Sequence, residues 1–201
     1  MIHTSRPATD TPARGRPAIL AAIVLSTAIA CGLLAIRTLD AQQSARATTD
    51  DVQTAYLAGG CFWGMEQLLR EVEGVIDTEV GYLDAAGGGP GVAETVRLHF
   101  DPSVVSYEEL LRFYVRIHDP TTRNRQGNDR GPEYRSAIFV VDDGQRRTAE
   151  RVRAEVDASG FWKRPLVTEI SGAGEFEVAE EGHQDYLVKN PGGYTCHFVR
   201  E

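Results

Sequence analysis

The stretch VQTAYLAGGCFWGMEQLLREVEG, residues 52–74, decides the fold because it joins a strand to a helix through a pair of glycines. Residues 52–59 predict a β-strand that runs into a glycine turn. From Phe62 onward, apolar side chains recur at helical spacing until the glycine at residue 74. Cys61 therefore stands where the strand has ended and the helix begins.

Further segments of regular structure follow this strand–helix unit. The expected strands are residues 75–82, 93–100, 136–141 and 166–170, and the expected helices are residues 106–118, 144–160 and 178–190. Ser106 and Glu109 have the spacing of a capping box at the start of their helix. This order predicts an α+β fold, a two-layer sandwich with one mixed sheet and a ferredoxin-like core with extra loops. The long loop 119–133 is of a length that is usually functional in a compact domain.

The N-terminal part of the chain has the features of a membrane-targeting segment. Residues 18–36 form a run of 19 uncharged, largely apolar residues, which as a helix would be roughly 28 Å long and close to the thickness of a bilayer core. Three arginines precede this run within residues 1–17. Their charge favours a cytoplasmic N-terminal segment and export of the remainder.

Two fates of this segment stay open. It is either a transmembrane anchor or the hydrophobic region of a signal peptide, with LDA at residues 39–41 as a cleavage site. Residues 37–51 are polar and predict a flexible linker to a domain at residues 52–201. We therefore expect an exported, periplasmic or extracytoplasmic domain, either membrane-anchored or released after signal cleavage.

Charge and cysteine content narrow the class of protein. The net charge of −8 argues against binding to a nucleic-acid backbone. Of three cysteines, Cys31 lies in the apolar N-terminal run, which leaves Cys61 and Cys196 in the exported part. In an oxidising compartment such a pair is either a structural disulfide or a redox pair that cycles, and the spacing does not choose between them.

The position of Cys61 favours a reactive thiol. A sulfur at a helix N-terminus faces unpaired N–H groups and the positive end of the helix dipole, which stabilise the nucleophilic thiolate and lower its pKa. Phe62 and Trp63 would add an apolar wall for a small nonpolar group. The alternative is a core cysteine followed by two aromatics that form the first helical turn.

Several stretches, in order, resemble the A-type peptide methionine sulfoxide reductase family. They are GCFWGME, QGNDRGPEYRSAIF, RPLVTEI, AEEGHQDYLVKNPGGY and YTCH, and the resemblance runs over residues 53–200. It implies a thiol-dependent enzyme that reduces (S)-methionine sulfoxide, free or in oxidised proteins and peptides, and so repairs oxidative damage. We expect a monomer that uses no cofactor and no metal and is recycled by a thioredoxin-like reductant.

The resemblance also implies catalytic roles. Cys61 would attack the sulfoxide sulfur and become a sulfenic acid, while Glu94 would protonate the oxygen. To act as an acid near neutral pH, Glu94 would need a pKa raised by burial. Cys196 would then form a Cys61–Cys196 disulfide, which the reductant opens. The alternative for Cys196 is a static disulfide that pins the C-terminus.

On the substrate side, the resemblance implies that Phe62 and Trp63 hold the methyl group of methionine sulfoxide. Asp129 and Tyr134, within the long loop, would line the pocket and bind the sulfoxide oxygen through the tyrosine hydroxyl. His183 follows Glu180 by three residues, but no further ligand has suitable spacing for a metal. We therefore expect His183 to make a hydrogen bond.

One connection departs from the family pattern. The loop LDAAGGGPGV, residues 83–92, is shorter than in typical members and lacks their tyrosine and their histidine, with Val92 at the histidine position. Tyr82 ends the preceding strand and does not replace that tyrosine, so Tyr134 is the one tyrosine expected in the pocket. We expect an active enzyme that is slower or differently selective. Alternatives are a general thiol–disulfide oxidoreductase or a catalytically impaired domain that binds oxidised peptides.

Overall fold

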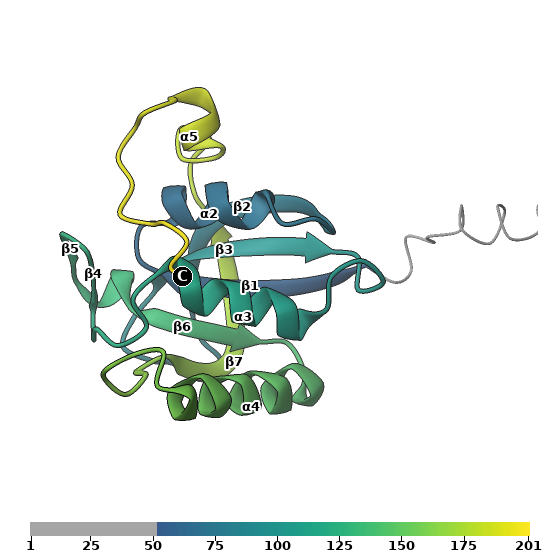
Figure 1. The fold of residues 1–201 in the computed structure, drawn as a ribbon. Coiled ribbons are helices and arrows are strands. Elements are labelled where there is room, and N and C mark those ends of the chain that lie inside the picture. The colour runs from purple at the N-terminus through teal and green to yellow at the C-terminus, as the bar shows by residue number, and fades with distance from the viewer. Residues whose placement is uncertain (1–51) are drawn as a thin grey trace, which may run out of the picture. The chain divides into compact units, whose positions relative to one another are not determined.

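The computed structural model describes residues 52–201 (Figure 1). The strands are β1 (Gln53–Gly59), β2 (Val75–Ala85), β3 (Ala93–Phe100), β4 (Arg125–Gln126), β5 (Asp129–Arg130), β6 (Ser136–Val140) and β7 (Glu169–Val178). The helices are α2 (Phe62–Arg70), α3 (Tyr107–Ile117), the short 3-10 helix η1 (Pro132–Tyr134), α4 (Asp143–Ser159) and α5 (Tyr186–Lys189).

The expected N-terminal segments, residues 1–17, 18–36 and 37–51, lie outside the described residues. Export and membrane attachment therefore stay predictions. Within residues 52–201, no helix combines the length and the apolar character that crossing a membrane requires.

The main sheet closes on itself in the order β1, β3, β2, β7, β6. Leu57 of β1 lies opposite Val96 of β3 on one side and Ile138 of β6 on the other, so β1 is paired along both edges. All pairs are antiparallel except β6 with β7. The predicted α+β class with one main mixed sheet is confirmed, and β4 and β5 pair in a separate two-stranded sheet. Closure of this sheet is a feature that the expected two-layer sandwich with a ferredoxin-like core did not include.

Both faces of the closed sheet are buried. Alternate residues such as Leu57 and Ile138 belong to the main hydrophobic cluster, which also takes side chains from α2, α3 and α4. Their neighbours Ala58 and Phe139 belong to a smaller cluster to which all five strands and no helix contribute. The smaller cluster therefore fills the inside of the barrel. Figure 1 shows α2 above and α4 below the strands, with α3 between them, and all three helices contribute to the main cluster.

Local sequence signals explain where the longer helices begin and end. The capping box of α3 is confirmed, since Ser106 Oγ accepts from Glu109 N and the Glu109 carboxylate accepts from Ser106 N at 2.8 Å. The side chain of Asp142 accepts from Gln145 N at the start of α4. Gly160 ends α4 in the left-handed conformation, with φ 73°.

The predicted helix at residues 178–190 is wrong in most of its length, since only α5 is helical there. The side chain of Gln184 accepts from Val80 N and donates to Val80 O, both at 2.9 Å, and so binds the backbone of β2. Asp185 takes a left-handed conformation with φ 55°. These long-range bonds compete with helix formation and hold the segment as turns against β2.

A buried polar network supports the end of β1 next to Cys61. Tyr114 OH donates to Ala58 O at 2.7 Å, and His118 lies between Tyr114 O and Ser136 Oγ, each at 2.7 Å from one ring nitrogen. Complete burial lowers the pKa of His118 to about 3, so the ring is neutral. A Cβ added at Gly59 would lie 2.9 Å from the His118 ring, so glycine is needed there.

Candidate active site

Cys61 is the N-cap residue of α2, as the sequence predicts. The preceding Gly60 has φ 104°, a backbone conformation that suits glycine and turns the chain from β1 into the helix. The thiol is free and only 6% exposed. The turn therefore delivers a single buried sulfur to the end of the barrel where β1 stops.

The expected low pKa of Cys61 is wrong for the resting protein. Burial raises the pKa of the thiol to about 12, and the backbone N–H of Trp63 only partly opposes this shift. The charges of Glu94, Asp129 and Cys196 raise the pKa further. Desolvation and three acidic neighbours thus outweigh the helix N-terminus. The resting group is a thiol, which must lose its proton as it reacts.

Glu94, on β3, lies directly beside the start of α2. Its Oε2 accepts a hydrogen bond from Phe62 N at 3.0 Å, the N–H that follows Cys61. Burial is the main cause that raises the pKa of Glu94 to about 7, with the charges of Asp129 and Glu133 adding to it. This agrees with the expectation from the sequence that burial raises the pKa. Near neutral pH, this carboxyl group can therefore both give and take a proton.

The glycine-rich loop between β2 and β3 faces open space at three of its residues. Gly87, Gly88 and Gly91 have positive φ, and an added Cβ at each would meet nothing within 4 Å, so these residues face open space. The Glu94 carboxylate is held by the N-terminus of α2. This hydrogen bond comes from outside the loop, so it fixes one carboxylate oxygen of Glu94 without a contact from those glycines.

The two aromatics after Cys61 are part of a larger aromatic group. The ring of Phe62 lies 5.7 Å from Tyr82 and 5.5 Å from His183, measured between centroids. Trp63 stacks on Tyr186 with centroids 3.7 Å apart and donates from Nε1 to His183 Nδ1 at 3.1 Å. The predicted hydrogen bond of His183 is thus present, with Trp63 as its donor.

Tyr82 and Tyr186 were missed as site residues. Tyr82 lies opposite Glu94 in the β2–β3 pairing, and burial followed by the Glu94 charge raises its pKa. Tyr82 is therefore a second tyrosine near Glu94, beside the predicted Tyr134. Glu180 Oε2 lies 3.7 Å from His183, but no group of three or more potential metal ligands occurs within residues 52–201.

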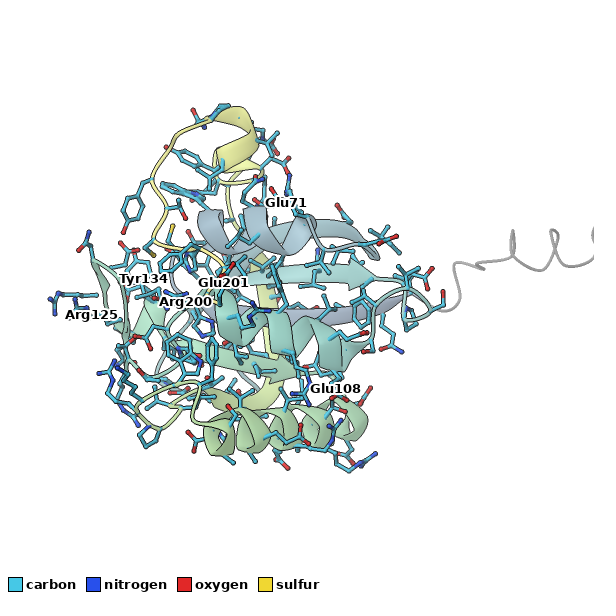
Figure 2. The ribbon with its side chains drawn as sticks, in the orientation of Figure 1. Glu71, Glu108, Arg125, Tyr134, Arg200 and Glu201 are labelled. Carbon is cyan, nitrogen blue, oxygen red and sulfur yellow. The ribbon has the colours of Figure 1, made fainter. Side chains whose placement is uncertain are left out.

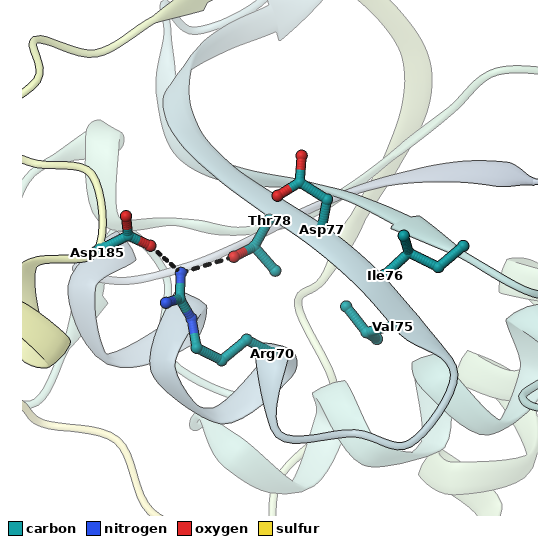
Figure 3. A pocket seen from close by; sticks show the side chains of 6 residues that line it. All are labelled: Arg70, Val75, Ile76, Asp77, Thr78 and Asp185. Carbon is teal, nitrogen blue, oxygen red and sulfur yellow. Dashed lines mark hydrogen bonds and ion pairs between the residues drawn. The ribbon is translucent and has the colours of Figure 1, made fainter.

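An ion network holds the aromatic group against α2. Arg70 binds Glu66, Asp185 and the Thr78 hydroxyl at 2.8, 2.5 and 2.8 Å, and Figure 3 shows the last two of these bonds. Asp185 N also donates to Glu66 at 3.0 Å. The residues around Arg70 line a hollow of about 190 Å³, but the guanidinium is already neutralised by two carboxylates. The network therefore ties Asp185, the residue before Tyr186, to α2.

Asp129 binds the C-terminal segment in this structure. Tyr194 OH donates to its two carboxylate oxygens at 3.1 and 3.0 Å, and Cys196 Sγ lies 3.5 Å from Oδ2. Cys196 is free, and burial followed by the Asp129 charge raises its pKa to about 11. Tyr194 is another site residue that sequence reasoning missed, although it stands two positions before the predicted cysteine.

Tyr134 comes from η1, which packs against the β4–β5 hairpin and β3. Figure 2 shows it at the same end of the molecule as Arg125 of that hairpin. Burial raises the pKa of Tyr134 to about 12, and the charges of Glu94, Asp129 and Cys61 add to the shift. The structure thus brings the predicted residues from β3, α2, the long loop and the C-terminus into one region.

Comparison with known proteins gives a consistent result. The family described as peptide methionine sulfoxide reductase matches residues 53–201. Peptide methionine sulfoxide reductase MsrA of Mycolicibacterium paratuberculosis is 52% identical over 158 residues, covering 75% of this chain and 91% of the relative. The structure is similar to reduced Mxr1 from Saccharomyces cerevisiae, with a TM-score of 0.70, 34% identity and coverage of 76% and 94%. Mxr1 in complex with Trx2 gives a TM-score of 0.57 at 28% identity, with coverage of 76% and 93%.

Proposed function

This chain belongs to the peptide methionine sulfoxide reductase family and is a peptide-methionine (S)-S-oxide reductase, and we propose how its own residues perform the reaction. Cys61 attacks the sulfoxide sulfur, and the sulfoxide oxygen is transferred to the cysteine. Glu94 protonates that oxygen and takes up the proton of the thiol. The products are methionine and a sulfenic acid on Cys61.

The position of Glu94 carries this proposal. Its carboxyl group is bonded to the N–H that follows Cys61, and its pKa of about 7 leaves both protonation states populated at neutral pH. Burial raises the pKa of the Cys61 thiol to about 12, so the thiolate is a minor species at neutral pH and the proposed step includes removal of the thiol proton. A neighbouring carboxyl group that exchanges protons near pH 7 suits this requirement.

Phe62 and Trp63 would receive the methyl group of the substrate. Trp63 is fixed by stacking on Tyr186 and by its bond to His183, which supports a rigid apolar wall. Tyr134, with a pKa far above neutral, stays protonated and can donate to the sulfoxide oxygen. Asp129 would order this side of the pocket once the C-terminal segment has moved away.

Cys196 would complete the cycle. Its sulfur attacks the Cys61 sulfenic acid, a disulfide forms, and the sulfenic oxygen leaves as water with the proton of Cys196. A thioredoxin-like protein would reduce the Cys61–Cys196 disulfide. The relative solved in complex with Trx2 supports this class of partner.

A single-turnover experiment tests the assignment. The reduced full-length protein is mixed with a peptide that contains (S)-methionine sulfoxide, and methionine formation and free thiols are counted. We expect one methionine and the loss of two thiols per protein in the wild type, one methionine in Cys196→Ser and none in Cys61→Ser. Methionine release by Cys61→Ser would refute the nucleophile. Thiol loss that does not require the sulfoxide would favour a general thiol–disulfide oxidoreductase.

A further inference from the structure

His197 is the best buried residue of the C-terminal segment, residues 191–201. It is 7% exposed, whereas Tyr194 is 42% and Phe198 is 59% exposed. Its Nε2 lies 2.8 Å from Gly59 O, at the end of β1 and two residues before Cys61. A single imidazole therefore joins the segment that carries Cys196 to the turn that carries Cys61.

The bond to Gly59 decides which ring nitrogen of His197 holds the proton. A carbonyl oxygen only accepts hydrogen bonds, so Nε2 must donate. Burial keeps the ring neutral, since it lowers the pKa of His197 to about 4. Nδ1 therefore carries a lone pair, and it lies 3.6 Å from Cys196 Sγ. Asp129 Oδ2, at 3.5 Å from the same sulfur, is the other acceptor for this thiol.

Glycines in α2 and before it create the space for His197. A Cβ added at Gly64 would lie 2.6 Å from His197 Nδ1 and 2.3 Å from Thr195 Oγ1. A Cβ at Gly60 would lie 3.2 Å from His197 Nε2. Glycine inside a helix makes the helix less stable than alanine would, by about 1 kcal/mol. Gly64 therefore does not stabilise α2. Its absent side chain admits the C-terminal segment.

We propose that His197 is a positioning residue for the resolving step, which anchors the C-terminal segment on Gly59 O and directs the Cys196 thiol through Nδ1. The inference rests on the proposed function and adds a residue to it. In that step an S–S bond forms between Cys196 and Cys61, and the S–O bond of the sulfenic acid breaks. The proton of Cys196, held by Nδ1 or Asp129 as the thiol reacts, leaves with the oxygen as water.

The test separates the two half-reactions in the reduced full-length protein. After mixing with a peptide that contains (S)-methionine sulfoxide, methionine release reports the attack by Cys61. Disulfide formation and trapping of sulfenic acid by dimedone report the resolving step. His197→Ala should slow disulfide formation about tenfold or more. The variant removes the hydrogen bond to Gly59 O that anchors the segment carrying Cys196. Sulfenic acid should accumulate in this variant while the methionine burst keeps its amplitude.

Two further variants make the result specific. His197→Gln keeps an N–H that can reach Gly59 O, so it should recover most of the lost rate. His99→Gln is the matched control, since it removes an imidazole of β3 that bonds the Thr54 hydroxyl of β1. Disulfide formation in this variant should proceed at the wild-type rate. Disulfide formation at the wild-type rate in both His197 variants would overturn the inference. A wild type without a methionine burst would instead overturn the proposed function.

Discussion

Replacing Glu94 with glutamine tests the proton chemistry of the site through stability as well as activity. Glutamine keeps the size of the side chain and an oxygen that can accept from Phe62 N, but it cannot ionise. In the wild type, burial raises the pKa of Glu94 from 4.5 to about 7. The folded protein therefore holds this proton more tightly than the unfolded chain does. The stability that this group contributes is fully present below pH 4.5 and is lost as the pH rises through 7.

The size of the effect follows from the shift. A rise from 4.5 to about 7, at about 1.4 kcal/mol per unit, corresponds to about 3 kcal/mol of unfolding free energy. Glu94→Gln should match the wild type near pH 4 and become more stable by up to about 3 kcal/mol above pH 7. Urea unfolding of both proteins, measured from pH 4 to pH 9, gives this difference directly. A difference that stays constant over this range, or grows in acid, would refute the reasoning.

Glu109→Gln provides a control of opposite sign. Hydrogen bonds from Ser106 lower the pKa of Glu109 in the capping box of α3. Its contribution to stability is therefore present above the unfolded pKa and is lost as the pH falls through the lower, folded pKa. Glu109→Gln should be less stable than the wild type at neutral pH, with the difference disappearing in acid.

The same Glu94→Gln variant should be impaired in the reaction. Removing a general acid–base group typically costs a factor of about 10² to 10⁴ in rate. In the wild type, methionine release should fall as the pH rises above 7, because the protonated form of Glu94 is lost. Rapid-quench measurement of methionine across pH provides both readouts. If Glu94→Gln were stabilised but released methionine at the wild-type rate, Glu94 would not be the general acid of the reaction.

Other substitutions give independent tests. Gly64→Ala places a methyl group against Thr195, so it should slow disulfide formation, which dimedone trapping measures. Tyr114→Phe removes the hydroxyl that bonds Ala58 O and should lower the unfolding free energy in urea by about 1–3 kcal/mol. Ser106→Ala deletes one half of the capping box and should cost about 1 kcal/mol, seen as a lower thermal midpoint.

Features determined by neighbouring residues were predictable from the sequence. The start of α3 follows from Ser106 and Glu109, because the side chain of each accepts a hydrogen bond from the backbone N–H of the other. Gly160 ends α4 because it can take a left-handed conformation. Cys61 falls at the start of α2 because a glycine turn precedes it. Each of these features depends on residues a few positions apart.

Features that depend on distant residues were not predictable in this way. Closure of the sheet requires β1 to pair with β6, about eighty positions along the chain. The turns before α5 follow from Gln184, which binds the backbone of Val80. The high pKa of Cys61 arises from burial and from acidic side chains on other elements. The position of Cys61 at a helix N-terminus alone would lower its pKa. Burial and the acidic neighbours raise the pKa by more than the helix lowers it.

The C-terminal segment, residues 191–201, should tolerate substitutions differently from the hydrophobic core. None of residues 191–201 belongs to either hydrophobic cluster, and the segment is fixed by polar contacts to Gly59, Asp129 and Arg116. Replacing exposed residues of the segment, such as Phe198, removes no core packing and should change the unfolding free energy little. His197 is the exception, because its loss leaves Gly59 O without a partner. In a library of random variants, a selection for expression would therefore tolerate changes at the exposed positions, and only a selection for repair would detect the loss of Cys196.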